Sequence, residues 1–334
     1  MKLSVLRLVT CLVAVCVRPA AALDGRQLAL IVNTSDPLSV QIGDYYAEQR
    51  RIVFSNVIRV SFAPSTFLSL PEFNAVKASI DEQTLPNIQA YAVTWAEPYR
   101  VECMSLTSAL TFGFDLAYCA DKCKPTRASR YYDSRATLPF AQLKIRPTMA
   151  IAATSFAEAK ALIDRGVESD GSEPVGTAYL LSTSDKARNV RASIYPVAEE
   201  IFKRRIYVRI QKRDAILYAR DVLFYFTGTT HVEGLNTLHF LPGAIADHLT
   251  SSGGQLTDSA QMSALRWLEA GATGSYGTVV EPCAMPQKFP NPAVVAKYYL
   301  AGETLIEAYW KSVAMPGQGI FIGEPLAAPF RKKK

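Results

Sequence analysis

Residues 28–52, with the sequence LALIVNTSDPLSVQIGDYYAEQRRI, have the pattern of a strand, a turn and a helix. The run from Leu28 to Asn33 is almost entirely apolar, which is typical of a strand buried on both faces of a sheet. Ser35 and Asp36 are candidate N-cap residues, and Pro37 suits the first helical position. This stretch therefore predicts the first strand-and-helix unit of a parallel sheet.

The same alternation returns along most of the chain. It predicts an α/β fold with mostly parallel sheets and helices on both faces. We expect two packed lobes, 23–170 and 171–330, with a single wide sheet as the alternative. A cysteine-containing insertion is expected at about 100–147. Strands are expected at 57–62, 88–98, 148–155, 178–183, 206–210, 222–228, 274–280 and 319–326, and helices at 71–84, 156–169, 190–205, 258–270 and 292–314.

The first 22 residues have the layout of an export signal. Lys2 and Arg7 precede an apolar run from Leu8 to Val17, and three alanines end the segment at Ala22. A membrane anchor needs roughly 20 apolar residues, so a cleaved signal peptide is the first interpretation and an uncleaved anchor the alternative. No later segment reaches spanning length. We therefore expect an exported protein of the periplasm or the extracellular space.

Four cysteines remain after the expected cleavage: Cys103, Cys119, Cys123 and Cys283. An even number of cysteines in an oxidising compartment favours disulfides. The short spacing predicts a local bridge between Cys119 and Cys123, which leaves Cys103 to pair with Cys283. A reactive Cys283 thiol is the alternative. A structural zinc site needs four Cys or His ligands, and the three histidines lie far downstream, so no metal is expected.

The charge pattern argues against a nucleic-acid partner. The net charge of +6 is small for 334 residues and lies partly in the basic tail 331–334. No basic stripe is interleaved with aromatic residues. The glycine-rich stretches at 271–277 and 317–323 lack the spacing of a dinucleotide-binding loop, so no cofactor is expected.

Polar residues gather after two apolar runs in the second half. The run 222–228 ends in Thr227 and Gly228, with His231 just beyond, and the run 274–280 is followed by Glu281. Ligands of open α/β sheets bind beyond the carboxyl ends of the strands. If these two strands are neighbours, their ends share one rim with the polar stretch PGAIADHLTSSGGQL at 242–256.

This rim permits a hydrolase interpretation, which needs a nucleophile, a base and donors for an oxyanion. Adjacent residues point in different directions, so Asp247 and His248 do not pair directly with each other. The alternative is a structural histidine at 231 and a helix end with a glycine stop. The candidates are His231 or His248 as base, Ser251 or Ser252 as nucleophile, Asp247 or Glu281 as orienter, and Gly253 and Gly254 as main-chain donors.

Several long motifs resemble a family of exported bacterial proteins that occurs with the exosortase protein-sorting system. They are the stretches at 30–50, 242–256, 263–283, 289–313 and 319–330. The resemblance implies export and names no reaction. The order of elements in the second half is also similar to caspase-like peptidases of the gingipain type, which implies that fold for 171–330.

The two catalytic positions of caspase-like peptidases are altered in this sequence. Thr227-Gly228 stands where the resemblance implies His-Gly, and no cysteine occurs in 247–251. We therefore expect a non-peptidase domain that binds exported or cell-envelope polypeptides. A hydrolase with rearranged residues and an assembly factor for surface proteins are the alternatives.

Overall fold

The computed structural model describes residues 22–120 and 122–332, and the expected signal peptide lies almost wholly outside this part. Strand β1, Leu28–Asn33, and helix α1, Pro37–Arg50, form the predicted first unit. The Asp36 carboxylate accepts a hydrogen bond from the Leu38 main-chain N–H at 2.9 Å, as expected of an N-cap. The helix ends at Arg51, which adopts the left-handed conformation.

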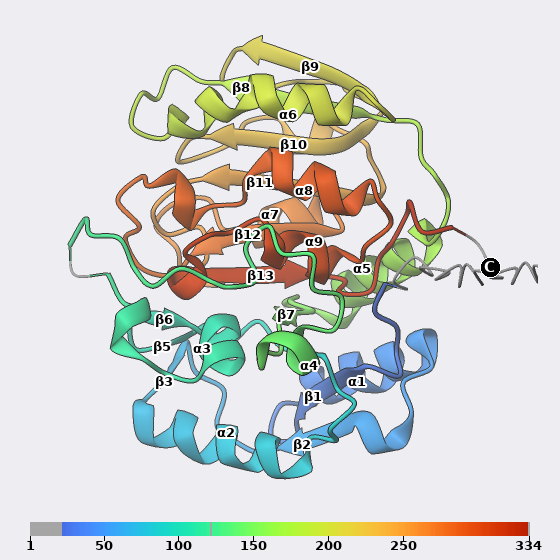
Figure 1. The fold of residues 1–334 in the computed structure, drawn as a ribbon, viewed down its shortest axis with the longest axis vertical. Coiled ribbons are helices and arrows are strands. Elements are labelled where there is room, and N and C mark those ends of the chain that lie inside the picture. Colours follow the sequence, from blue (N-terminus) through green and yellow to red (C-terminus); the bar gives the residue numbers. More distant parts are fainter. Residues whose placement is uncertain (1–21, 121, 333–334) are drawn as a thin grey trace, which may run out of the picture.

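Ten strands form one central sheet in the order β2-β1-β4-β7-β13-β12-β11-β10-β8-β9 (Figure 1). All neighbours are parallel except β12 and β13. The predicted α/β fold with a mostly parallel sheet is confirmed. The other strands of this sheet are β2 Val57–Val60, β4 Ala90–Val93, β7 Thr148–Ala150, β8 Thr177–Ser182, β9 Tyr207–Lys212, β10 Val222–Gly228, β11 Phe240–Leu249, β12 Gly274–Thr278 and β13 Gly319–Gly323.

Helices cover both faces of the sheet. Helices α6, α8 and α9 pack together on one face, and α5 and α7 lie on the other, where α1 packs against α5 (Figure 1). The remaining helices are α2 Leu70–Gln83, α3 Leu106–Phe112, α4 Pro139–Leu143, α5 Phe156–Ser169, α6 Tyr195–Phe202, α7 Leu265–Glu269, α8 Pro292–Tyr299 and α9 Leu305–Lys311. Short 3₁₀ turns lie at Phe54–Asn56, Leu116–Tyr118, Asn189–Ile194, Leu235–Thr237, Pro286–Lys288 and Pro316–Gln318.

The sheet is continuous through both halves, which corresponds to the alternative of a single wide sheet and not to two packed lobes. The last strand, β13, returns between the halves and pairs with both β12 and β7. All five of its residues are buried, so it forms the middle of the sheet. One hydrogen-bonded layer therefore runs through both halves of the sequence.

The polar stretch 242–256 begins as a strand. Strand β11 runs through Leu249, and its residues from Gly243 onward are buried. The helix expected at 258–270 is reduced to α7, because polar side chains at 259, 261 and 263 bond to neighbouring loop atoms instead. Such local bonds compete with helix formation.

Both disulfide pairings expected from spacing are wrong, although all four cysteines are bridged. The bonds are Cys103–Cys119, with Cα atoms 5.5 Å apart, and Cys123–Cys283, with Cα atoms 5.1 Å apart. The second bond ties the 100–147 insertion to the loop after β12. This insertion contains strands β5 Arg100–Val101 and β6 Met104–Ser105, which form a small sheet with β3 Phe67–Leu68.

Within residues 22–120 and 122–332, no helix is long and apolar enough to cross a membrane.

Candidate functional site

The carboxyl ends of β10 and β11 lie side by side at one edge of the sheet. Phe226 is in register with Asp247, and Thr227 is in register with His248. Strand β11 lies between β10 and β12, so these two strands are not neighbours and that condition for a shared rim is not met. The loop after β11 nevertheless reaches β12, since the Gly254 N–H donates to the Thr278 carbonyl at 2.9 Å.

His248 is fully buried and both of its ring nitrogens are engaged. The Trp267 indole N–H donates to Nδ1 at 2.9 Å, which fixes the proton on Nε2. That Nε2–H donates to the Met262 carbonyl at 3.0 Å. Burial lowers the pKa of His248 to about 3. The imidazole is thus neutral and has no free nitrogen for proton transfer.

Asp247 points to the opposite face of the sheet. Its carboxylate forms an ion pair with Arg191 at 2.5 Å, and the Tyr309 hydroxyl donates to it at 2.9 Å. The Arg191 guanidinium also donates to the Thr227 carbonyl at 2.8 Å. Burial alone would lower the pKa of Arg191, but the Asp247 carboxylate raises it overall. The pair therefore joins two strand ends beneath the rim and does not face a serine.

Ser251 and Ser252 present their main-chain N–H groups to one acceptor. That acceptor is Oε1 of Gln261, which lies 2.9 Å from the Ser251 nitrogen and 3.0 Å from the Ser252 nitrogen. The Thr250 hydroxyl donates to the same oxygen at 2.6 Å. Three donors thus converge on an amide oxygen of the protein itself, in the manner of an oxyanion hole that is already filled. The Ser252 hydroxyl bonds to Ser259 at 3.1 Å, not to a histidine.

The glycines at the strand ends allow close packing. A Cβ on Gly254 would lie 2.5 Å from the Gly277 carbonyl oxygen, and one on Gly228 would lie 2.0 Å from the Arg188 carbonyl oxygen. A Cβ on Gly253 would lie 3.4 Å from the His248 ring. Gly228 and Gly254 require glycine because main chain meets main chain there, whereas a Cβ on Gly253 would meet the Thr250 side chain at 3.1 Å.

The remaining predicted site residues are exposed. His231 Nε2 lies 3.8 Å from Glu233 Oε1, and the two side chains are 63% and 81% exposed. Glu281 accepts a hydrogen bond from the Cys283 N–H at 2.7 Å, within the turn that carries the disulfide. Among the described residues, no histidine ring nitrogen is hydrogen-bonded to a serine. The structure thus does not assemble the predicted His, Ser and Asp arrangement.

Two adjoining hollows lie beside helix α7, and we call them together the α7 groove. Their volumes are about 440 and 580 Å³. Both are lined by His231, Met262 and Arg266. The rest of the lining is mixed. Its apolar residues are Val232, Leu235, Leu238, Leu256, Ala260 and Ala270, and its polar residues are Thr230, Glu233, Asn236, Thr257, Ser259, Gln261, Ser263 and Glu269. The rim predicted from sequence therefore contains a surface groove, and His231 is the predicted residue that lines it.

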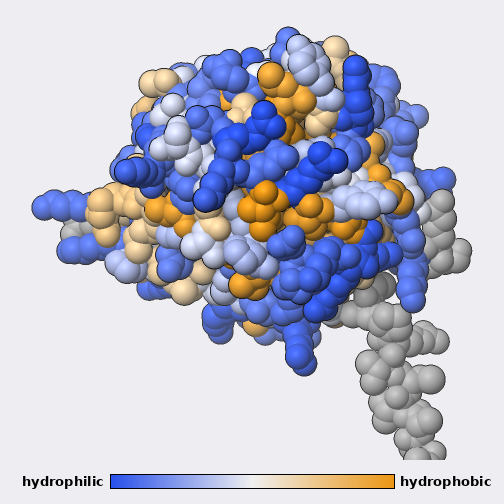
Figure 2. Space-filling model, turned by 90° about the horizontal axis from the view of Figure 1, so that it is seen from above, coloured by the Kyte–Doolittle hydropathy of each residue, from blue (hydrophilic) through white to orange (hydrophobic). Residues whose placement is uncertain are grey.

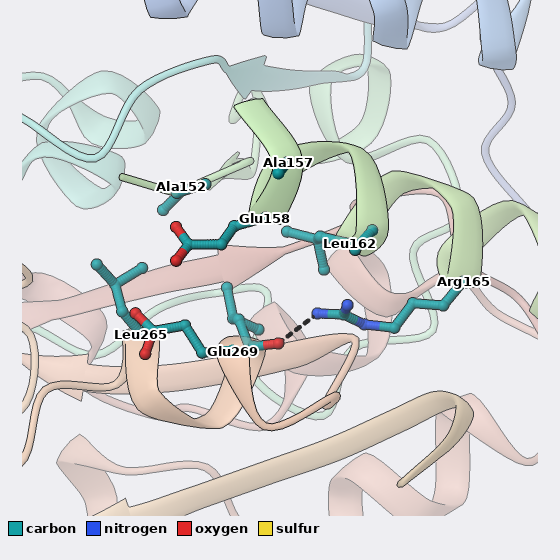
Figure 3. Close-up of a pocket in the computed structure, with 10 residues that line it drawn as sticks. Ala152, Ala157, Glu158, Leu162, Arg165, Leu265 and Glu269 are labelled. Carbon is teal, nitrogen blue, oxygen red and sulfur yellow. Dashed lines mark hydrogen bonds between the residues drawn. The ribbon is translucent and has the colours of Figure 1, made fainter. Parts of the chain in front are cut away.

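A third hollow, of about 260 Å³, separates α7 from α5 (Figure 3). Glu158 and Glu269 face it from the two helices, and burial together with the Glu158 charge raises the pKa of Glu269. Glu158 also caps α5 through the Ser155 N–H at 3.1 Å. Arg165 donates to the main-chain carbonyl of Leu268 at 2.6 Å, near the end of α7. Glu158 and Arg165 thus complete helix ends, and Glu269 forms an ion pair with Arg266. We therefore interpret the hollow as a packing feature.

Sequence reasoning missed the residues that decide the state of the rim. Gln261, Arg191 and Trp267 each complete a polar group at the strand ends. Gln261 stood within an expected helix, and the other two lie 56 and 19 residues from their partners. No local pattern could have indicated these contacts. Within the described residues, no three Cys, His, Asp or Glu side chains are placed to hold a metal ion.

Comparison with known proteins gives a distant structural likeness. No protein-family model and no curated protein matches the chain. A solved structure described as "Structure of Protease" is similar over 92% of this chain and 79% of its own, with 10% identity and a TM-score of 0.49. Because this likeness is so weak, we infer the role of the rim from the geometry of its own residues.

Proposed function

We propose that this chain is an exported, non-catalytic binding protein that holds a polypeptide segment in the α7 groove. One observation carries the proposal. The buried imidazole and the main-chain donors at the end of β11, which hydrolysis would need as base and oxyanion donors, are already bonded within the protein. His248 is held between Trp267 and Met262, and the donors after β11 converge on Gln261.

Hydrolysis by the residues predicted at the rim would require a serine close to a basic imidazole. His248 offers neither a free nitrogen nor a pKa near neutrality, because burial lowers that pKa to about 3. His231 is open to solvent and its nearest charged partner is Glu233 at 3.8 Å. This supports binding without chemistry at the rim.

The lining of the α7 groove suits a polypeptide. Its apolar residues can contact peptide side chains, and His231 and the N–H groups of Arg266 that are not used in its ion pair with Glu269 can donate to peptide carbonyls. Binding pockets are concave and combine apolar surface with polar groups that fix the orientation of the ligand.

Two features support an exported setting. Both disulfides require an oxidising compartment to persist. The chain also carries the signal-like segment at 1–22 and motifs that resemble those of exosortase-associated proteins. We therefore place the bound polypeptide among exported or cell-envelope proteins, with a role in their sorting or surface export.

The test is selection of peptides from a random library on the immobilised oxidised protein, followed by affinity measurement. Changing Arg266→Gln or His231→Ala is expected to weaken a selected peptide by about tenfold, the effect of losing one or two hydrogen bonds. The matched control is Arg135→Gln, an exposed arginine in the 100–147 insertion. Equal affinity of all variants would show that peptides bind elsewhere, and failure to select any peptide would overturn the proposal.

A further inference from the structure

Strand β9 forms one edge of the central sheet and is open along its length. It pairs with β8 at all six of its residues and, among the described residues, with no other strand. The Tyr207 N–H donates to the Gly176 carbonyl at 3.0 Å, and the Arg213 N–H donates to the Ser182 carbonyl at 3.1 Å. Main-chain groups alternate in direction along a parallel strand. Positions 208, 210 and 212 therefore present their N–H and C=O groups at the free edge.

The opposite edge of the sheet is protected. Strand β2 has four residues, two of them buried, and helix α2 packs against it. In β9 none of the six residues is buried, and Tyr207 and Ile210 are 66% and 40% exposed. Natural sheets usually shorten or cover their edges. The two edges of this sheet thus differ in a way that favours pairing at β9.

The β9 edge is also strongly basic. Between residues 203 and 213 the sequence KRRIYVRIQKR has six basic residues and no acidic one. Lys203 pairs with Glu200, and Arg205 lies near Glu173. The other four cations, at 204, 209, 212 and 213, form no ion pair with any residue that the structure describes. Figure 2, viewed from the β9 side, shows hydrophilic side chains around smaller hydrophobic patches.

Charge decides which strand can pair there. A second copy of this chain would bring β9 against an equally basic β9, and like charges across strands are destabilising. An acidic strand would instead place carboxylates opposite Arg209 on one face of the sheet or opposite Lys212 on the other. Its alternate apolar side chains would meet Tyr207 or Ile210, depending on the face.

We propose that β9 is a docking edge for an extended, acidic polypeptide segment, which adds to the central sheet as an eleventh strand. This site is separate from the α7 groove and does not depend on the proposed function. Main-chain hydrogen bonds supply the pairing, and the unpaired cations select the acidic sequence.

The test uses a fluorescein-labelled peptide of alternating glutamate and valine, long enough to span β9. One variant, Arg209→Glu/Lys212→Glu, reverses the charge. A second, Ile210→Pro, removes an N–H that faces the free edge and leaves the bonds to β8 in place. The control Arg51→Glu/Arg59→Glu makes the same change of net charge at the β2 edge. Circular dichroism confirms that each variant folds.

We expect the peptide to bind the wild type and the control equally. Both β9 variants should weaken binding by about tenfold or more. A peptide of equal charge interrupted by prolines should bind poorly, because it cannot form a strand. Equal binding of that peptide would overturn strand addition. Dimerisation through β9 would overturn the proposal of an acidic polypeptide partner. Binding to phosphatidylglycerol vesicles in place of the peptide would also overturn it.

Discussion

Replacing His248 with glutamine tests the buried, neutral imidazole at the end of β11. Glutamine has no charge to gain, yet its amide oxygen can accept from Trp267 and its NH₂ group can donate to Met262. The two bonds that hold the wild-type ring, at 2.9 and 3.0 Å, therefore have counterparts in the variant. The main difference is that the variant cannot bind a proton at this position.

The size of the effect follows from the two pKa values of His248. Burial lowers the folded-state pKa to about 3, against 6.5 for the exposed group. Between these values the unfolded chain binds a proton that the folded chain excludes. Stability from the neutral ring is thus fully present above pH 6.5 and is lost as the pH falls toward 3. The loss between pH 7 and pH 5 amounts to about 2 kcal/mol.

Urea unfolding at a series of pH values between 7 and 5 measures this loss of unfolding free energy. The wild type should lose about 2 kcal/mol more unfolding free energy over this range than His248→Gln. Subtracting the two curves removes the contribution of the carboxylates, which both proteins share. His231→Gln is the control for replacing an exposed histidine. Parallel curves for the wild type and His248→Gln would refute the buried neutral imidazole.

Three further changes test the internal bonds around the rim. Gln261→Leu leaves three converging donors without their acceptor and should lower the unfolding free energy by about 1–3 kcal/mol, measured in urea. Asp247→Asn leaves the buried Arg191 cation without its counter-charge and should cost about 3–5 kcal/mol in the same assay. Reduction of the Cys123–Cys283 disulfide, which spans 160 residues, should cost about 2–4 kcal/mol and lower the melting temperature.

Each of these predictions has a matched control. Gln261→Glu keeps the side-chain acceptor and should stay closer to the wild type than the leucine variant. The double variant Arg191→Met/Asp247→Leu removes both charges and should recover most of the stability that Asp247→Asn loses. A Cys123→Ser/Cys283→Ser protein lacks this disulfide, so reductant should not lower its unfolding free energy by breaking that bond. Failure of any control to differ from its test variant would contradict the corresponding contact.

The sequence predicted the regular elements well where apolar runs and caps coincide. The bounds of β1, α5 and β10 match the expected segments, because a continuous apolar run or a capping box marks each one. Such signals are local, since they depend on residues within a few positions of one another. The resulting parallel sheet with two covered faces followed from their alternation.

The site was harder to predict because its decisive contacts join distant segments. Asp247 and His248 look like surface residues in sequence, yet both are buried in β11. Their partners, Arg191 and Trp267, come from other elements and compensate the cost of burial. The disulfide partners depend in the same way on the path of the 100–147 insertion, which spacing alone does not determine.

The central claim is that the rim binds polypeptide without cleaving it. The most direct measurement is mass spectrometry of a library-selected peptide after long incubation with the oxidised protein, in parallel with the His231→Ala variant. Recovery of the intact peptide, bound more tightly by the wild type, is the predicted result. Cleavage of the peptide at a defined bond, absent with His231→Ala, would contradict it.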